Sequence, residues 1–315
     1  MIRCPAALVL AATFAGSLGA GGPIHCGVEM RHVALHVADG VVLQIDSLDG
    51  EFISRSAHEP PIFDDPTSYT LDVRRAEMSI DATSLTTLLN RRAFAGPHAP
   101  LSDVRVTIEH GALRAHGKLH KGVSVPFEMT AAVSATPDGR LRLHATKLKA
   151  VGIPVKGLLD LLGLQVDRLM KMPPGAGIRA DGDDLLIDTA AILPPPRTEG
   201  RLADVRVSGH ALRLRMIGSA DPPARPASRP DPAARNYLYF YGGSIRFGRL
   251  TMANTDLQLI DANPRDPFDF FPADYNAQLV AGYSRNTRRG GLRVYMPDYA
   301  RVRANGGMLK APRVR

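Results

Sequence analysis

The sequence predicts an α+β fold in which a strongly curved antiparallel sheet wraps around one or two apolar helices, followed by a C-terminal mainly-β extension. The first observation is a period of two: residues 104–109 read Val-Arg-Val-Thr-Ile-Glu and residues 140–145 read Arg-Leu-Arg-Leu-His-Ala. Such alternation is typical of strands with one face on a core and the other in water. The second is a crowded apolar run at residues 158–164. A short helix this apolar cannot stay in water, so we expect it to cover the dry face of the strands.

The composition predicts a folded protein with a basic surface. Of the 315 residues, 44% are hydrophobic and 22% are charged, which excludes wholesale disorder. The net charge of +8 attracts phosphates, either of nucleic acid or of anionic lipid headgroups. Because the basic residues are scattered singly along the chain, we expect no nucleic-acid partner, and the surface is compatible with peripheral contact with an anionic membrane.

The N-terminus has the pattern of an export signal. A basic start precedes an apolar stretch at residues 6–15, and small residues follow up to Ala20. The stretch is too short for a membrane span but has the length of a signal-peptide core. We therefore predict a signal peptide over residues 1–20 and export to the periplasm or cell envelope.

Cysteine usage points away from a disulfide framework. Only Cys4 and Cys26 occur, and Cys4 lies in the predicted signal peptide. Cys26 then has no internal partner, so the fold must rest on its core. A lipid anchor on Cys26 is the alternative, although the preceding residues 23–25 (Pro-Ile-His) lack the small side chains of a lipoprotein processing site.

The first predicted elements are a hairpin and a capped helix. Residues 28–48 alternate loosely on both sides of Asp39-Gly40, a dipeptide typical of a hairpin turn. Residues 69–73 read as a strand. Asp81 then begins a helix that runs to about Phe94, because its carboxylate can accept the unpaired N–H groups of the first turn.

Two further hairpins surround the turns of the middle segment. Residues 101–119 turn at Gly111, and residues 123–148 turn at Pro137-Asp138-Gly139. The leucine-rich run comes next, and residues 202–216 alternate again. Together these elements form a predicted α+β domain.

A weak internal repeat links two of these strands. Residues 101–107 read Leu-Ser-Asp-Val-Arg-Val-Thr and residues 202–208 read Leu-Ala-Asp-Val-Arg-Val-Ser. Duplication is one interpretation. Two strands under the same alternation constraint is the other, and it is favoured because the segments between them differ.

Proline content sets the domain boundaries. Residues 221–235 contain five prolines and cannot hold a helix or a central strand, so they are predicted to be a linker or long loop. The α+β domain then spans residues 21–220, and residues 236–315 form a β-rich extension of unknown role. That extension is predicted to begin with a hairpin over residues 237–250 that turns at Gly242-Gly243.

The C-terminal extension also contains an aromatic segment. Residues 267–271 (Pro-Phe-Asp-Phe-Phe) read as a loop that either packs onto this half of the chain or forms a membrane-facing lip. A short helix over residues 275–282 and a strand over residues 292–296 are expected to follow.

No motif of catalysis or metal binding is present. His116 and His120 share a strand face with Lys118, which repels a cation, and the acidic residues within 261–269 lack calcium-loop spacing. Phosphate-binding glycine loops and hydrolase motifs are missing as well. We therefore expect no metal, no cofactor and no enzymatic activity, with a hydrolase built on the Asp and His residues of the second half as an alternative.

One ordered series of motifs spans roughly residues 69–216. Its members are residues 78–89 (Met-Ser-Ile-Asp-Ala-Thr-Ser-Leu-Thr-Thr-Leu-Leu), 101–106, Gly117, Val125-Pro126, 138–143 (Asp-Gly-Arg-Leu-Arg-Leu) and 152–164. This series resembles the bacterial LmeA-type phospholipid-binding proteins of the cell envelope. The resemblance implies a tubular lipid-binding-like fold, with a curved sheet around an apolar groove, and a lipid carrier that performs no chemical step. Residues 236–315 have no counterpart in that family.

The predicted function is therefore an exported lipid-binding or lipid-carrier protein whose ligand is a phospholipid or another acyl-chain molecule. The residues expected to line the groove are Leu85, Leu88, Leu89, Leu158, Leu159, Leu161 and Leu162. The residues expected to meet the headgroup are Lys147, Lys149 and Lys156. The alternative is an envelope structural or assembly protein whose core is closed and whose surface binds another protein or a polymer.

Overall fold

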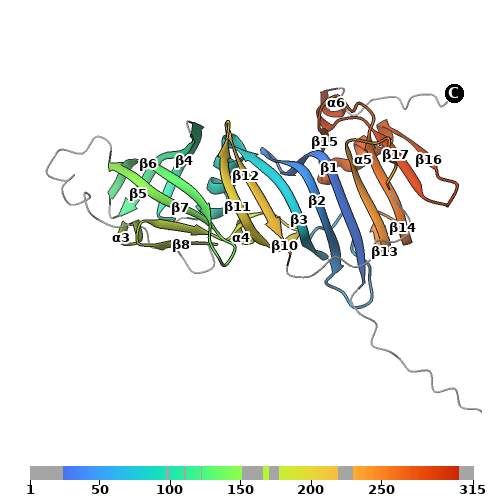
Figure 1. Cartoon of the computed structure of the whole chain (residues 1–315), viewed down its shortest axis with the longest axis horizontal. Coiled ribbons are helices and arrows are strands. Elements are labelled where there is room, and N and C mark those ends of the chain that lie inside the picture. Colours follow the sequence, from blue (N-terminus) through green and yellow to red (C-terminus); the bar gives the residue numbers. More distant parts are fainter. Residues whose placement is uncertain are drawn as a thin grey trace, which may run out of the picture.

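The computed structural model describes residues 24–96, 99–109, 111–121, 123–150, 166–169, 177–218 and 230–304 (Figure 1). Strands dominate, most pairs are antiparallel, and helices are few and short, which agrees with the α+β class. Two sheets lie one after the other along the long axis of the molecule, as Figure 1 shows. The predicted signal peptide and the leucine-rich run at residues 158–164 lie outside the described residues.

The larger sheet, called sheet A, combines both ends of the described chain. Its strands are β1 (His25–Ala38), β2 (Val41–Ser54), β3 (Tyr69–Asp81), β10 (Arg197–Glu199), β11 (Arg201–Ser208), β12 (Ala211–Ile217), β13 (Tyr237–Phe247), β14 (Leu250–Asp261), β15 (Phe268–Phe270), β16 (Tyr283–Asn286) and β17 (Leu292–Met296). The main order is β11-β12-β3-β2-β1-β13-β14-β17-β16, with β10 beside β3 and β15 beside β1. Because β1 pairs directly with β13, the residues after 236 continue the sheet begun by the N-terminal strands.

The smaller sheet, called sheet B, comes from the middle of the chain. Its strands are β4 (Leu101–Glu109), β5 (Ala112–Lys121), β6 (Val123–Ala135), β7 (Leu141–Ala150), β8 (Ile178–Asp181) and β9 (Asp184–Ile187). They pair antiparallel in the order β4-β5-β6-β7-β9-β8. The alternation of apolar and polar residues in the sequence matches the alternation of buried and less buried side chains in the strands. On β4, for example, Val104, Val106 and Ile108 are buried.

The helices among the described residues are short and lie around the sheets. They are α1 (Ala82–Leu88), the π-helical turn η1 (Leu89–Ala93), α3 (Val166–Leu169), α4 (Thr189–Ile192), η2 (Pro272–Asp274), α5 (Tyr275–Ala281) and α6 (Tyr299–Ala304). Asp81 caps α1 as expected, with its carboxylate accepting a 2.7 Å bond from the Ser84 N–H. Within the described residues, no helix has the length and apolar character that crossing a bilayer requires.

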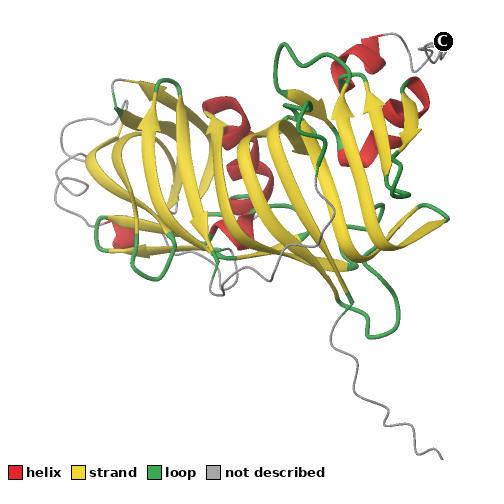
Figure 2. Cartoon of the chain, turned by 45° about the vertical axis from the view of Figure 1, so that its right-hand side comes forward, coloured by secondary structure: helices red, strands yellow, loops and turns green. Residues whose placement is uncertain are grey.

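Helix α1 joins the two sheets, and Figure 2 shows a helix between their strands. On one side the Ser84 hydroxyl accepts a 3.1 Å bond from the Val42 N–H of sheet A. On the other side Asn90, in η1, accepts a 3.0 Å bond from the Val104 N–H and donates a 2.6 Å bond to the Val104 carbonyl oxygen. Because β4 is an end strand of sheet B, these side-chain bonds satisfy backbone groups that no strand meets on that side.

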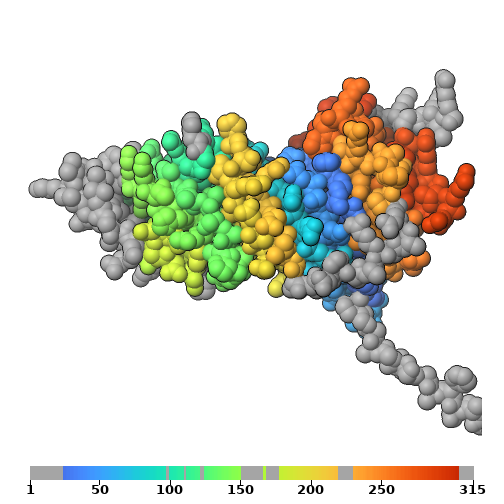
Figure 3. All heavy atoms as spheres, in the orientation of Figure 1, coloured from blue at the N-terminus to red at the C-terminus, as the bar shows by residue number. Residues whose placement is uncertain are grey.

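A second contact between the sheets lies at the β6–β7 turn. The Leu202 N–H on β11 donates a 3.1 Å bond to the Gly139 carbonyl oxygen. Gly139 has a positive φ, and a Cβ at this position would overlap Arg201. Figure 3 shows the gold surface of β11 and β12 meeting the green surface of sheet B without a gap on this face.

The two similar segments occupy similar places in the fold. Residues 101–107 lie in β4 and residues 202–208 in β11, and each strand ends its sheet. Each also changes register near its start, between Ser102 and Arg105 on β4 and between Leu202 and Asp204 on β11. The two segments therefore share an end position and an early irregularity, although Asp103 has a positive φ and Asp204 does not.

The prediction of a hairpin turn at Gly242-Gly243 is wrong. Strand β13 runs through both glycines, and the chain turns at Gly248 instead. Both glycines have positive φ angles of 64° and 42°, and a Cβ on Gly243 would overlap the carbonyl oxygen of His25. These glycines therefore let β1 approach a bent strand and do not mark a turn.

The aromatic segment at residues 267–271 packs into the core. Phe268 and Phe270 form strand β15, pair parallel with β1 and have no exposed surface. The predicted loop is thus a short strand, and these two side chains pack into the core.

Cys26, on β1, is also 0% exposed, and burial raises the pKa of its thiol to about 12. This core position does not suit a lipid anchor.

Candidate functional site

The main candidate site is a cavity of about 280 Å³ between sheet B and helix α1, called the sheet B cavity. All six strands of sheet B contribute to its wall. Its described lining residues are Leu85, Leu89, Phe94, Leu101, Val104, Val106, Leu113, Ala115, Leu119, Val125, Phe127, Met129, Leu141, Leu143, Leu148, Lys149, Val166, Ile178, Leu185 and Ile187. Among them only Lys149 carries a charge.

The alternation of the strands produces this apolar wall. Val104 and Val106 on β4 lie on the same face as Leu113 and Ala115 on the neighbouring β5, because side chains two positions apart share a face. The polar side chains between them, such as Arg114, face the opposite side and are exposed. One face of sheet B is therefore dry and the other is wet.

The predicted groove residues divide into three groups. Leu85 and Leu89 line the sheet B cavity. Leu88 is 3% exposed and lies in the core without being among the residues that line this cavity. The third group, Leu158, Leu159, Leu161 and Leu162, lies outside the described residues.

A polar hollow of about 360 Å³ lies on the wet face of sheet B and is called the outer hollow. Its titratable lining residues are Arg114 and His116 on β5, Glu128 on β6, and Lys147 and Lys149 on β7. The strand register places Glu128 opposite both His116 and Lys149, so basic groups lie on both sides of one carboxylate. Lys149 also lines the sheet B cavity, so it belongs to both spaces.

Of the lysines predicted to meet a headgroup, Lys147 and Lys149 line this hollow, and only Lys149 also lines the apolar cavity. Arg114 and His116 join them through cross-strand pairing, a relation that only the register of β5, β6 and β7 reveals. Lys156, the third predicted residue, lies outside the described residues.

A second apolar cavity, called the sheet A cavity, has a volume of about 220 Å³. Strands β1, β2 and β3 supply about half of its wall, and residues 193–196 (Leu-Pro-Pro-Pro) and Phe271 contribute to the remainder. Phe52 and Tyr69 stack in this wall with ring centroids 4.4 Å apart. Sequence reasoning missed this cavity, because its wall joins segments far apart in the chain.

Polar groups gather near the Phe271 side of the sheet A cavity. His36 lines the cavity and contacts the Asp269 carboxylate at 2.5 Å. Burial raises the pKa of Asp269, but the hydrogen bonds from His36 and from the Ala300 N–H outweigh burial and leave the pKa low. Burial also raises the pKa of Asp298 to about 6, assisted by repulsion from nearby carboxylates.

Two of the acidic residues considered for calcium, Asp261 and Asp269, have protein partners. Asp261 accepts bonds from the Asn236 amide and from the Asn263 N–H, and Asp269 pairs with His36. Across the part of the chain that the structure describes, no three His, Cys, Asp or Glu side chains are arranged to hold a metal ion. Comparisons with family models, curated proteins and solved structures find no match to this chain.

Proposed function

We propose that the protein is an exported lipid-binding or lipid-carrier protein that performs no chemical step. The sheet B cavity holds an acyl chain, and the anionic headgroup lies at Lys149, near the end of β7, the charged residue that lines both this cavity and the outer hollow. The observation that carries the proposal is the wall of the sheet B cavity, which among its described residues is apolar except for Lys149. Contributions from all strands of sheet B support a curved sheet around an apolar groove, as the resemblance to LmeA-type proteins implies.

The volume of the cavity suits part of an acyl chain. An apolar cavity of roughly 150 Å³ stays dry and binds benzene. The sheet B cavity measures about 280 Å³, so by proportion it accommodates roughly eleven carbons. Burying a methylene contributes about 0.8 kcal/mol. Even if only about eight methylenes were buried, fewer than the volume allows, they would contribute about 6 kcal/mol before the costs of association.

Lys149 links the two parts of the proposed ligand. Its side chain borders the apolar cavity, as expected for a lysine whose methylene stem lies on apolar surface while its ammonium stays in water. Lys149 also lines the outer hollow with Lys147, Arg114 and His116, so its ammonium is the group we assign to the phosphate. This arrangement favours an amphipathic anion over an uncharged apolar molecule.

The site is tested by filling the cavity. Ala115 is 6% exposed and lines the sheet B cavity, so Ala115→Phe places a ring in the space proposed for the ligand. Ala132→Phe adds the same ring to an exposed position on the neighbouring strand and serves as the matched control. We expect Ala115→Phe to weaken displacement of a fluorescent fatty acid at least tenfold, with Ala132→Phe unchanged.

Two results would contradict this proposal. The first is a wild-type chain that carries no lipid in native mass spectrometry and takes up no added phospholipid, which would favour a closed core. The second is equal binding by both phenylalanine variants.

The headgroup site is tested separately by charge removal. We expect Lys149→Gln and Lys147→Gln each to weaken binding of phosphatidylglycerol about three- to tenfold, while binding of an uncharged diacylglycerol stays unchanged. Lys118→Gln is the control, because Lys118 lies on the same face but is paired with Asp103 at 2.8 Å. Equal losses for all three variants would show a diffuse charge effect and no headgroup site.

A further inference from the structure

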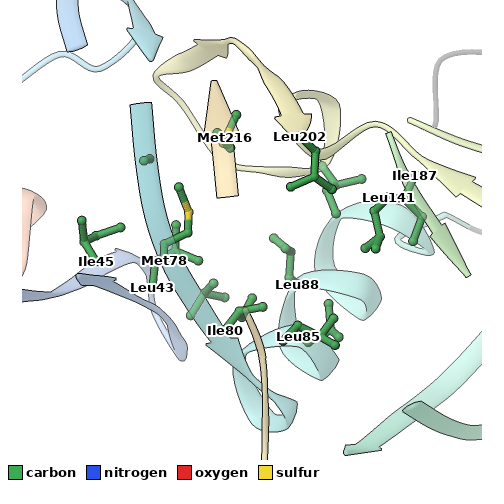
Figure 4. Packing of buried hydrophobic residues seen from close by; sticks show 14 of the residues in the cluster. Leu43, Ile45, Met78, Ile80, Leu85, Leu88, Leu141, Ile187, Leu202 and Met216 are labelled. Carbon is green, nitrogen blue, oxygen red and sulfur yellow. The ribbon is translucent and has the colours of Figure 1, made fainter. Parts of the chain in front are cut away.

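The two apolar cavities lie on opposite sides of a packed layer. Figure 4 shows Met78 and Ile45, which line the sheet A cavity, on one side and Leu141 and Ile187, which line the sheet B cavity, on the other. All of these residues belong to one continuous cluster of buried side chains. The layer between the cavities is therefore apolar from one wall to the other.

Three buried residues that lie between these walls are called the partition: Ile80, Leu88 and Leu202. They are 4%, 3% and 1% exposed and line neither cavity. Ile80 shares a face of β3 with Met78, which lies in the wall of the sheet A cavity. Leu88 follows Leu85 by three positions on α1, so it points from the same side of the helix.

Leu202 lies where strand β11 of sheet A meets the β6–β7 turn of sheet B. It is the direct cross-strand partner of Met216, which lines the sheet A cavity. Its own N–H donates to the Gly139 carbonyl oxygen in sheet B. One backbone position is thus tied to both sheets, while its side chain fills the space between their cavities.

We propose that the two cavities are successive compartments of one apolar channel and that Leu88, Leu202 and Ile80 limit how far an acyl chain can enter. This inference rests on the proposed function, because it assigns chain-length selectivity to the same binding site. The sheet B cavity accepts the first part of the chain. The sheet A cavity, of about 220 Å³, accepts a further part only when the partition opens.

The partition has a measurable consequence for affinity. Each methylene that enters an apolar cavity strengthens binding about fourfold, the equivalent of about 0.8 kcal/mol. A chain that reaches the partition gains nothing from additional methylenes, because they remain in water. The affinity of the wild-type protein is therefore expected to rise with chain length and then level off.

The experiment measures the dissociation constants of saturated fatty acids of increasing length, by displacement of a fluorescent fatty acid. In Leu202→Ala, affinity is expected to keep rising for at least about three carbons beyond the wild-type plateau, the number that the substitution removes. Leu202→Val is the conservative variant, for use if the alanine variant unfolds, and is expected to move the plateau in the same direction. Leu259→Ala is the matched control, because Leu259 is 3% exposed on β14 and lines neither cavity.

The possible results separate this inference from the proposed function. A wild-type protein that binds no fatty acid would overturn both. Normal binding with a plateau that stays in place in both Leu202 variants would overturn the partition alone. A wild-type affinity that rises without levelling off would also overturn the partition, since it would show that the chain already passes these residues.

Discussion

The attachment of α1 to sheet B gives the sharpest prediction for stability. Asn90 makes three side-chain bonds: its amide donates to the Thr86 carbonyl oxygen at 2.9 Å and to the Val104 carbonyl oxygen at 2.6 Å, and its oxygen accepts from the Val104 N–H at 3.0 Å. Val104 is 3% exposed, so Asn90→Ala leaves two backbone groups without a partner in a nearly dry place. With a net value of about 1 kcal/mol for each bond and the cost of partly buried unpaired groups, we expect a loss of about 2 to 4 kcal/mol in the free energy of unfolding.

Urea unfolding measures this loss as a lower midpoint at an unchanged slope. Asn90→Asp keeps the acceptor for the Val104 N–H but points a carboxylate oxygen at the Thr86 and Val104 carbonyl oxygens, so at neutral pH its loss should be at least as large as that of alanine. Asn286→Ala, at an exposed position on β16, is the control and should change stability by less than about 0.5 kcal/mol. A loss below about 0.5 kcal/mol for Asn90→Ala as well would refute the idea that these bonds hold the helix to the strand.

Three further predictions concern other parts of the fold. Gly243→Ala should lower the free energy of unfolding by at least about 3 kcal/mol, because its Cβ would overlap the His25 carbonyl oxygen. The Cβ of Gly248→Ala would meet nothing nearby, so this variant should lose only about 1 to 2 kcal/mol through backbone strain. Equal losses in urea unfolding would contradict this prediction. Burial raises the folded-state pKa of Asp298 to about 6, above the ordinary value of an aspartate, so the native state holds its proton more tightly and this group's contribution to stability falls as pH rises from about 4 to 6. Asp298→Asn should therefore be more stable than wild type at pH 7 and lose this advantage near pH 4; a stability difference that does not vary with pH would refute the assignment. Cys26 should react with a thiol reagent only in denaturant, because its thiol is buried and its pKa is about 12, and rapid labelling of the native protein would contradict the core position.

Local elements could be read from the sequence because their signals are local. Asp39-Gly40 and Pro137-Asp138-Gly139 each place a turn where the structure has one, and Asp81 caps the predicted helix. The period of two also identified which side chains of β4 and β7 would be buried. Each of these features depends on residues within a few positions of one another.

Features that depend on distant segments could not be read in this way. Gly242-Gly243 looks like a turn until β1 is known to pass beside it, and that neighbour is about two hundred positions earlier in the chain. Likewise, the helical spacing of Leu85, Leu88 and Leu89 predicted the same groove-lining role for all three. In the structure Leu85 and Leu89 line the sheet B cavity, whereas Leu88 does not. That distinction depends on which sheet each side chain meets.

The connectivity of the sheets sets an order for folding. Sheet B uses strands from one continuous stretch, residues 101–187, whereas sheet A is incomplete until the C-terminal strands return to β1. The Cys26 thiol and the Tyr241 carbonyl oxygen, which approach each other across the β1–β13 pair, are separated by 215 positions. Contacts so distant in the chain form slowly, so during synthesis sheet B should acquire protected amides while β1 still lacks its final neighbour. Sheet B can thus form its apolar wall before the molecule is complete, and pulse-labelling hydrogen exchange would register that interval as early protection confined to residues 101–187.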